Sequence, residues 1–120
     1  MDQVSKIRWW QWILCRSWRV VLVVEAADDV PARLPRNAAV LVGSYAMQKW
    51  LVFDCPCRSG HRVMLNLDRG RFPHWRVASQ NKLTVAPSVD WKVNGRSCHY
   101  FIRSGRVVWA HHVRLKEHRQ

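Results

Sequence analysis

Two short segments of this chain carry thiols and imidazoles close together. The first is Cys55-Pro56-Cys57-Arg58-Ser59-Gly60-His61, and the second is Ser97-Cys98-His99. Thiolate and imidazole are common zinc ligands, and they also carry nucleophilic catalysis. The candidate ligands are Cys55, Cys57, His61 and Cys98, with His99 as a substitute for His61. They make a complete tetrahedral set and predict a structural Zn²⁺ site. In the alternative interpretation, Cys55 and Cys57 are small buried apolar residues that end a strand.

A nucleophile and its base are the second kind of chemistry that these residues suggest. Ser88 and Cys98 are the candidate nucleophiles, and His99 is the candidate general base. Adjacent residues of a strand point to opposite faces, so His99 suits Ser88 on a neighbouring strand better than it suits Cys98. The carboxylates that could orient the imidazole are Asp28, Asp29 and Asp90, with Asp29 as the first candidate. The alternative is that Ser88 has only a structural role.

The charge of the chain predicts an acidic partner. The formal net charge is +12, and residues 61–120 hold twelve Lys and Arg against three Asp and Glu. Such a field favours nucleic acid, an anionic membrane surface or an acidic protein, without choosing among them. Trp75-Arg76 and Trp91-Lys92 interleave aromatic and basic side chains, a pattern that suits single-stranded nucleic acid, although tryptophans of a β domain are more often core residues.

The apolar content bounds the class of protein. Hydrophobic residues make up 48% of the chain, which supports a core. The longest apolar run, residues 20–24, has the length of a buried strand and predicts no transmembrane segment. Arg16 and Arg19 interrupt the stretch that imitates a signal peptide, so we expect a cytoplasmic protein with reduced cysteines. Reduced cysteines favour metal binding or catalysis over disulfides.

The hydrophobic patterns predict a mainly β fold, a β-rich α+β domain with a small antiparallel, sandwich-like sheet. In the Trp- and Arg-rich residues 1–19, the apolar spacing predicts an amphipathic N-terminal helix. Asp28-Asp29-Val30-Pro31 predicts one short helical turn. A single β-rich domain is expected over residues 20–112, and a basic tail over 113–120. Strands are expected over residues 20–25, 39–42, 49–54, 62–67, 75–78, 82–85, 100–103 and 107–109, so both cysteine segments are predicted on connections.

An ordered series of short motifs resembles one bacterial family. The series is Val24-Glu25-Ala26-Ala27-Asp28-Asp29-Val30-Pro31, Cys55-Pro56-Cys57, Leu65-Asn66-Leu67, Trp75-Arg76, Ala86-Pro87-Ser88-Val89, His99-Tyr100-Phe101-Ile102-Arg103 and Gly105-Arg106-Val107-Val108-Trp109. It resembles domain-of-unknown-function family 6527, whose genes often lie beside those of ubiquitin-like conjugation. The resemblance implies a peptidase-like protein that processes or removes a ubiquitin-like protein at its C-terminus. Its implied partners are that protein or its conjugating enzymes.

The resemblance also bears on individual site residues. The family's Pro-Ser and His-aromatic-aromatic motifs fall on Pro87-Ser88 and His99-Tyr100-Phe101, which implies a serine nucleophile at Ser88 with His99 as its partner. Where the family usually reads Cys-Pro-Cys-Gly-Cys-Gly, this chain has Arg58-Ser59 after Cys57, so the third cysteine is missing. Relatives often place a serine where this chain has Cys98. Cys98 is therefore either a replacement metal ligand, together with His61, or a replacement nucleophile.

Overall fold

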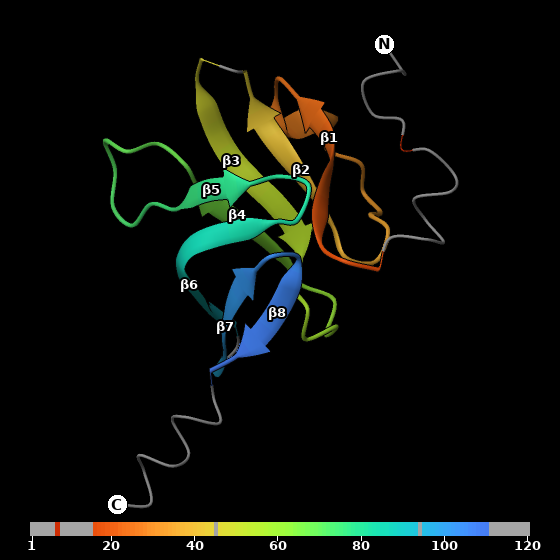
Figure 1. The fold of residues 1–120 in the computed structure, drawn as a ribbon, viewed down its shortest axis with the longest axis vertical. Coiled ribbons are helices and arrows are strands. Elements are labelled where there is room, and N and C mark those ends of the chain that lie inside the picture. Colours follow the sequence, from red (N-terminus) through yellow and green to blue (C-terminus); the bar gives the residue numbers. More distant parts are fainter. Residues whose placement is uncertain (1–6, 8–15, 45, 94, 111–120) are drawn as a thin grey trace, which may run out of the picture.

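The computed structural model of the protein describes residues 7, 16–44, 46–93 and 95–110. These residues contain two four-stranded β-sheets (Figure 1). Each sheet follows the chain order, β1-β2-β3-β4 and β5-β6-β7-β8. The first contains β1 (Arg19–Val24), β2 (Ala38–Gly43), β3 (Gln48–Asp54) and β4 (Arg62–Asn66). The second contains β5 (Arg76–Ser79), β6 (Thr84–Val93), β7 (Arg96–Arg103) and β8 (Arg106–Trp109). The prediction of a mainly β fold is confirmed.

The inner faces of the two sheets share one hydrophobic core. Leu51 and Phe53 of β3 are fully buried in the same cluster as Val89 of β6 and Tyr100 and Ile102 of β7. Alternate residues of each strand enter this cluster, as the two-residue period of a strand requires. Burial of a large apolar side chain contributes about 1.5–3 kcal/mol, so this shared cluster holds the two sheets together.

The strand β2 is buried on both faces. Ala39 and Leu41 lie in the shared core, whereas Val40 and Val42 lie in a second cluster that Val30 and Leu34 help to cover. Double burial explains why β2 reads as a continuous apolar run rather than an alternating one. β1 and β2 are parallel, and a parallel pair needs a crossover. Residues 25–37 supply it, and they provide the second layer over β2.

The helical predictions are only partly right. The predicted helical turn is present as the 3₁₀ turn η2 (Ala27–Asp29), but it ends before Pro31 instead of continuing through it. Val30 takes an extended backbone, as steric contact with a following proline favours. The predicted N-terminal helix lies mostly outside the described residues, and the described positions 7 and 16–18 are not helical. No helix in the described part of the chain is long and apolar enough to cross a membrane.

The described Trp18 packs into the core instead of lying on a helix face. Its ring meets Phe53 edge-on, with centroids 5.5 Å apart, and the residue is 6% exposed. The Trp18 N–H donates to the Gly105 carbonyl at 2.8 Å. Gly105 lies at the turn between β7 and β8, so the start of the first sheet is tied to a hairpin of the second.

The β6–β7 pair is longer than the sequence indicates. Ala86-Pro87 predicts a break, yet β6 continues to Val93. Val85 pairs with Ile102 and Val89 with Tyr100, so residues 86–88 of β6 face only Phe101 of β7. Within such a bulge, a proline need not donate a ladder hydrogen bond. Cys98 and His99 therefore lie inside β7, and the prediction that both cysteine segments occupy connections is wrong for the second segment.

Candidate catalytic pair and candidate metal centre

The strand β7 presents Cys98 and His99 to opposite faces of the second sheet. Tyr100 and Ile102 are fully buried and mark the inner face, which Cys98 shares by alternation. His99 lies on the outer face beside Phe101, with ring centroids 6.1 Å apart. One residue step along a single strand thus separates two groups of chemically active side chains.

On the outer face, a serine and a histidine are in hydrogen-bond contact. Ser88 Oγ lies 3.0 Å from His99 Nε2, and both residues are half-buried. This distance is the one that a nucleophile and its general base need. The Trp75 indole N–H donates to the Ser88 carbonyl at 3.1 Å and anchors the backbone of that residue. The bulge at residues 86–88 supplies the local bend, as bulges beside functional sites commonly do.

The carboxylate that would complete a triad with Ser88 and His99 is indicated only by strand register. Asp90 pairs with His99 in the β6–β7 register, so both side chains lie on the outer face. The Ser97 hydroxyl donates to Asp90 Oδ1 at 2.9 Å and holds this carboxylate. Asp29 lies exposed in η2, and among the described residues its carboxylate has no hydrogen bond to His99. The orienting role of Asp29 stays a prediction that no contact supports.

On the inner side, the four predicted metal ligands converge. One ligand atom from each of Cys55, Cys57, His61 and Cys98 lies within 4.8 Å of the other three. Ligand atoms of a tetrahedral zinc site with bonds of about 2.3 Å lie roughly 3.8 Å apart, so small side-chain shifts would suffice to close the site. Cys57 Sγ is already 3.8 Å from His61 Nδ1. Three thiols and an imidazole fit Zn²⁺, and none of these three cysteines is in a disulfide.

The loop between β3 and β4 carries three of these ligands. The Arg58 N–H donates to the Cys55 carbonyl, and the Cys55 N–H donates to the His61 carbonyl, both at 3.0 Å. These bonds close the loop and place the side chains of Cys55, Cys57 and His61 near one another. Cys98 arrives from β7 of the other sheet. His99, the predicted substitute for His61, is not a member of the cluster. An ion at this site would join the two sheets.

The thiols of the cluster differ in acidity. Burial raises the pKa of Cys55 to about 12, so without a cation this group stays a neutral thiol at neutral pH. Burial also acts on Cys57, but hydrogen bonds from Ser59, Cys55 and Cys98 outweigh it and lower the Cys57 pKa. Burial raises the pKa of Tyr100, and the neighbouring Cys55 thiol adds to the effect. Tyr100 Oη lies 3.9 Å from Cys55 Sγ. A bound cation would reverse the penalty on these thiolates.

Comparison with known proteins adds the family. A family model described as the bacterial ubiquitination-like system serine protease, BubE, matches residues 26–110. The chain belongs to the BubE family. No curated protein and no solved structure gives a significant match. Membership makes the chain a protease-like component of a bacterial ubiquitination-like system, as the resemblance implied, whereas the designation 6527 is not confirmed.

Two residues that contact the candidate site in this BubE-family chain, Trp75 and Ser97, have no signal for that role in the sequence. Trp75 reads as a core or nucleic-acid residue, yet its indole holds the Ser88 carbonyl. Ser97 has no predicted role beyond its place next to Cys98, yet its hydroxyl donates a hydrogen bond to the Asp90 carboxylate. Both contacts depend on which residues face one another across antiparallel strands, and on the bulge in β6. That register is a tertiary property, and periodicity alone does not supply it.

Proposed function

We propose that this chain is a serine peptidase that cleaves at the C-terminal tail of a ubiquitin-like protein, either maturing that tail or removing the protein from its targets. The contact of 3.0 Å between Ser88 Oγ and His99 Nε2, in a member of the BubE family, is the observation that carries this proposal. Cys98 lies among the metal ligands on the other face, which favours Ser88 as the nucleophile.

The reaction follows from the roles of these two side chains. As a base, His99 carries its proton on Nδ1, and the Ser88 hydroxyl donates to Nε2. Ser88 Oγ attacks the scissile carbonyl carbon while its proton passes to Nε2. The bond to the leaving amine breaks, and the imidazolium returns the proton to that amine. A water molecule then attacks the acyl-serine, gives its proton to His99, and releases the new carboxyl end together with the free Ser88 hydroxyl.

Two further groups support the pair. Asp90 pairs with His99 in the β6–β7 register, and we assign it, ahead of Asp29, the stabilisation of the imidazolium. The metal centre of Cys55, Cys57, His61 and Cys98 would hold a structural Zn²⁺. When bound there, zinc supplies a crosslink between the β3–β4 loop and β7, the strand that also carries His99. It takes no part in the proton transfers.

Cleavage of an extended ubiquitin-like protein tests the proposal. We expect Ser88→Ala to lower the rate at least about a thousandfold, because it removes the nucleophile. Ser79→Ala is the matched control, since Ser79 is an exposed serine of β5 in the same sheet. Cys98→Ala, once shown to be folded, should retain cleavage. Undiminished cleavage by Ser88→Ala would overturn the assignment, and loss in folded Cys98→Ala alone would make Cys98 the nucleophile.

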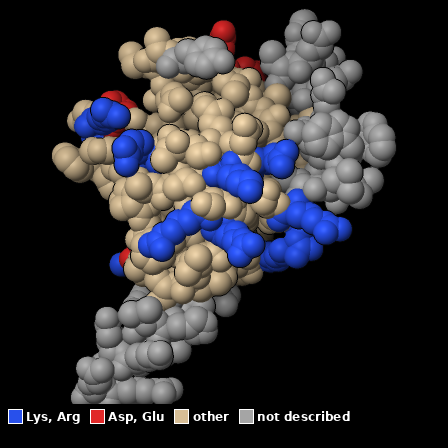
Figure 2. Space-filling model, in the orientation of Figure 1, with Lys and Arg blue, Asp and Glu red and all other residues tan. Residues whose placement is uncertain are grey.

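A second candidate function is a zinc-stapled binding module that docks an acidic protein or single-stranded nucleic acid. A hollow of about 520 Å³ is lined by four arginines, Arg33, Arg36, Arg58 and Arg62, and by Asp54 as its acidic residue. Figure 2 shows Lys and Arg side chains gathered across the middle of one face, with acidic side chains near its margins. Nucleic-acid binding would weaken steeply with salt. Absence of retention on single-stranded nucleic acid at low salt would remove that branch.

A further inference from the structure

A basic hollow is lined by the two residues of β6 that precede Ser88. It has a volume of about 540 Å³ and is lined by Arg69, His74, Arg76, Ala86 and Pro87. Arg76 pairs with Ala86 in the β5–β6 register, and Pro87 immediately precedes the proposed nucleophile. A substrate segment held at Ser88 would therefore pass this hollow within a residue or two of its scissile bond.

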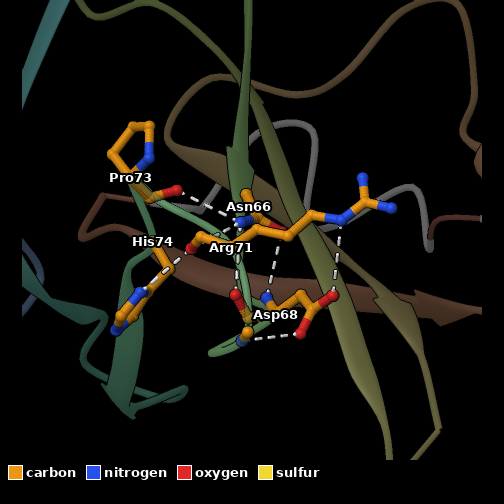
Figure 3. A network of polar contacts seen from close by, with 6 residues as sticks. Asn66, Asp68, Arg71, Pro73 and His74 are labelled. Carbon is orange, nitrogen blue, oxygen red and sulfur yellow. Dashed lines mark hydrogen bonds and ion pairs between the residues drawn. The ribbon is translucent and has the colours of Figure 1, made fainter.

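The loop that supplies Arg69 and His74 is held by a network of polar contacts (Figure 3). The Asn66 side-chain amide donates to the carbonyls of Asp68, Arg71 and Pro73 at 3.1–3.4 Å. Its Oδ1 accepts the Asp68 N–H at 3.0 Å. One side chain at the end of β4 thus fixes both ends of the loop, so the backbone that carries Arg69 and His74 is held in place.

The acidic group of this loop is already engaged. Asp68 accepts the Gly70 N–H at 2.9 Å and pairs with Arg71 at 3.8 Å. Among the described residues, neither Arg69 nor Arg76 has an ion pair or a side-chain hydrogen bond, and both are exposed. The hollow therefore offers two guanidinium groups whose charge no carboxylate of the described chain neutralises.

His74 lines the hollow, but its one hydrogen is already engaged. Its Nδ1 lies 3.1 Å from the Arg71 carbonyl, and a carbonyl only accepts, so Nδ1 carries a hydrogen. Nε2 of the neutral ring then carries no hydrogen and acts as an acceptor, so a carboxylate would be held by the arginines and not by His74. The guanidinium groups of Arg69 and Arg76 match the fork of a carboxylate, which Arg recognises with paired N–H donors.

We propose that this hollow is a carboxylate-binding subsite that makes the peptidase prefer a negative charge within two residues of the scissile bond. The inference rests on the proposed function, because the subsite gains its meaning from Ser88. The carboxylate can be the side chain of Asp or Glu or the free C-terminal end of the substrate, and both present the same group. Asp90 lies on the other side of Ser88 along β6 and would disfavour a carboxylate there, which leaves the Arg76 side as the favoured one.

Matched substrates test the subsite. Each substrate is an extended ubiquitin-like protein that carries a single Glu at one of the two positions nearest the scissile bond, on one side of that bond or on the other. Each Glu substrate is compared with a version that has Gln at the same position. A further pair has a free or an amidated C-terminus, which separates the two sources of carboxylate. We expect wild type to favour one charged member by about five- to tenfold in kcat/KM. Arg76→Gln should bring that ratio close to one, whereas Arg106→Gln, an exposed arginine of β8 outside the hollow, should keep it.

Binding to Ser88→Ala separates the two hypotheses, because this variant cannot turn over substrate through Ser88. Calorimetric titration with the same pairs should show the same preference, lost in Ser88→Ala/Arg76→Gln. Ser88-dependent cleavage without any charge preference would overturn the subsite and leave the peptidase intact. A charge preference in binding, without cleavage by wild type, would overturn the peptidase and keep the subsite. Equal affinities for all charged and neutral pairs would overturn the subsite regardless of cleavage.

Discussion

Cys98 and His99 are neighbours in β7, but the two faces they occupy differ in physical character. The inner cluster contains one buried thiol, Cys55, which is neutral at neutral pH without a cation, and three half-buried ligands. The outer pair is half-exposed and consists of a hydroxyl and an imidazole across an antiparallel strand pair. A cluster anchored on a buried thiol suits a site that stabilises the fold, whereas a half-buried hydroxyl beside an imidazole suits contact with a substrate.

One strand therefore serves two groups of reactive side chains that lie on opposite faces of the sheet. A side chain on the inner face reaches the thiols of the β3–β4 loop, and its neighbour on the outer face reaches Ser88. Substitutions on the two faces should therefore leave different experimental signatures. Metal content and unfolding report on the inner face, and cleavage reports on the outer face.

The largest expected effect is that of His99→Gln on catalysis. Glutamine keeps a polar side chain on the outer face but cannot accept the Ser88 proton as a base, so the cleavage rate should fall about 10²- to 10⁴-fold. Zinc content and melting temperature should stay at wild-type values, because His99 is not in the metal cluster. Rate assays and metal analysis on the same preparation check both parts. A fall in zinc content would break the separation of the two faces.

Cys98→Ala should give the opposite signature. Removal of one of four zinc ligands is expected to lower bound zinc well below one ion per chain and to cost several kcal/mol of folding stability. Metal analysis and thermal unfolding of the full chain measure these effects. Wild-type protein that folds fully without metal, and gains no stability from added zinc, would contradict the stapling role.

Replacing the candidate ligand His61 by a cysteine at position 59 tests which residues can complete the inner metal cluster. The resembled family usually has a cysteine where this chain has Ser59, and His61 is the fourth member of the possible metal cluster here. His61→Ala should lose zinc affinity, and Ser59→Cys added to His61→Ala should restore much of it, since a thiolate again completes the set. Ser59→Ala in the same background is the matched control. Equal zinc affinity in the cysteine and alanine double variants would show that position 59 cannot reach the ion.

The two faces also differ in how far the sequence alone predicts them. The possible metal cluster is predictable from the sequence because its residue types are typical metal ligands and three of them, Cys55, Cys57 and His61, lie on one short loop. The Ser88–His99 contact was predicted only through strand alternation and a family resemblance. The contacts of Trp75 and Ser97 beside this pair are not predictable, because Pro87 gives no sign in the sequence that β6 continues through a bulge. Asp90 could not be ranked above Asp29 without the register that pairs it with His99.

The strands show the same limit at the level of the fold. Local apolar patterns predict strands over residues 100–103 and 107–109, and the turn that joins β7 to β8 between them has positive φ at Ser104 and Gly105. They did not predict the extent of β6 and β7, because Ala86-Pro87 breaks the pattern that a strand normally shows. The sharing of one core by two sheets depends on contacts far apart in sequence, such as that of Cys55, just after β3, with Tyr100 of β7.

Metal-free protein should lose stability as the pH rises above 9. The Cys55 pKa is about 12 in the fold against 9.0 ordinarily, so the unfolded chain gives up its proton first. This contribution is fully present below pH 9 and is lost as the pH approaches 12, with a slope of at most about 1.4 kcal/mol per pH unit. Urea unfolding of chelator-treated protein at pH 8 to 10.5 measures it. Cys55→Ala is the control, and an equal slope in that variant would exclude Cys55 as the cause.

The smallest expected effect is that of Arg58→Gly in the metal-binding loop. Arg58 has φ of +62°, a left-handed conformation that costs energy for a residue with a Cβ and little for glycine. We expect glycine here to stabilise the zinc-loaded protein by about 0.5–1 kcal/mol, with unchanged cleavage. Arg58→Ala removes the same charge but keeps the Cβ, so it should give no such gain in urea unfolding. Equal stabilisation by both variants would mean that charge repulsion, rather than backbone conformation, opposes the fold of this loop.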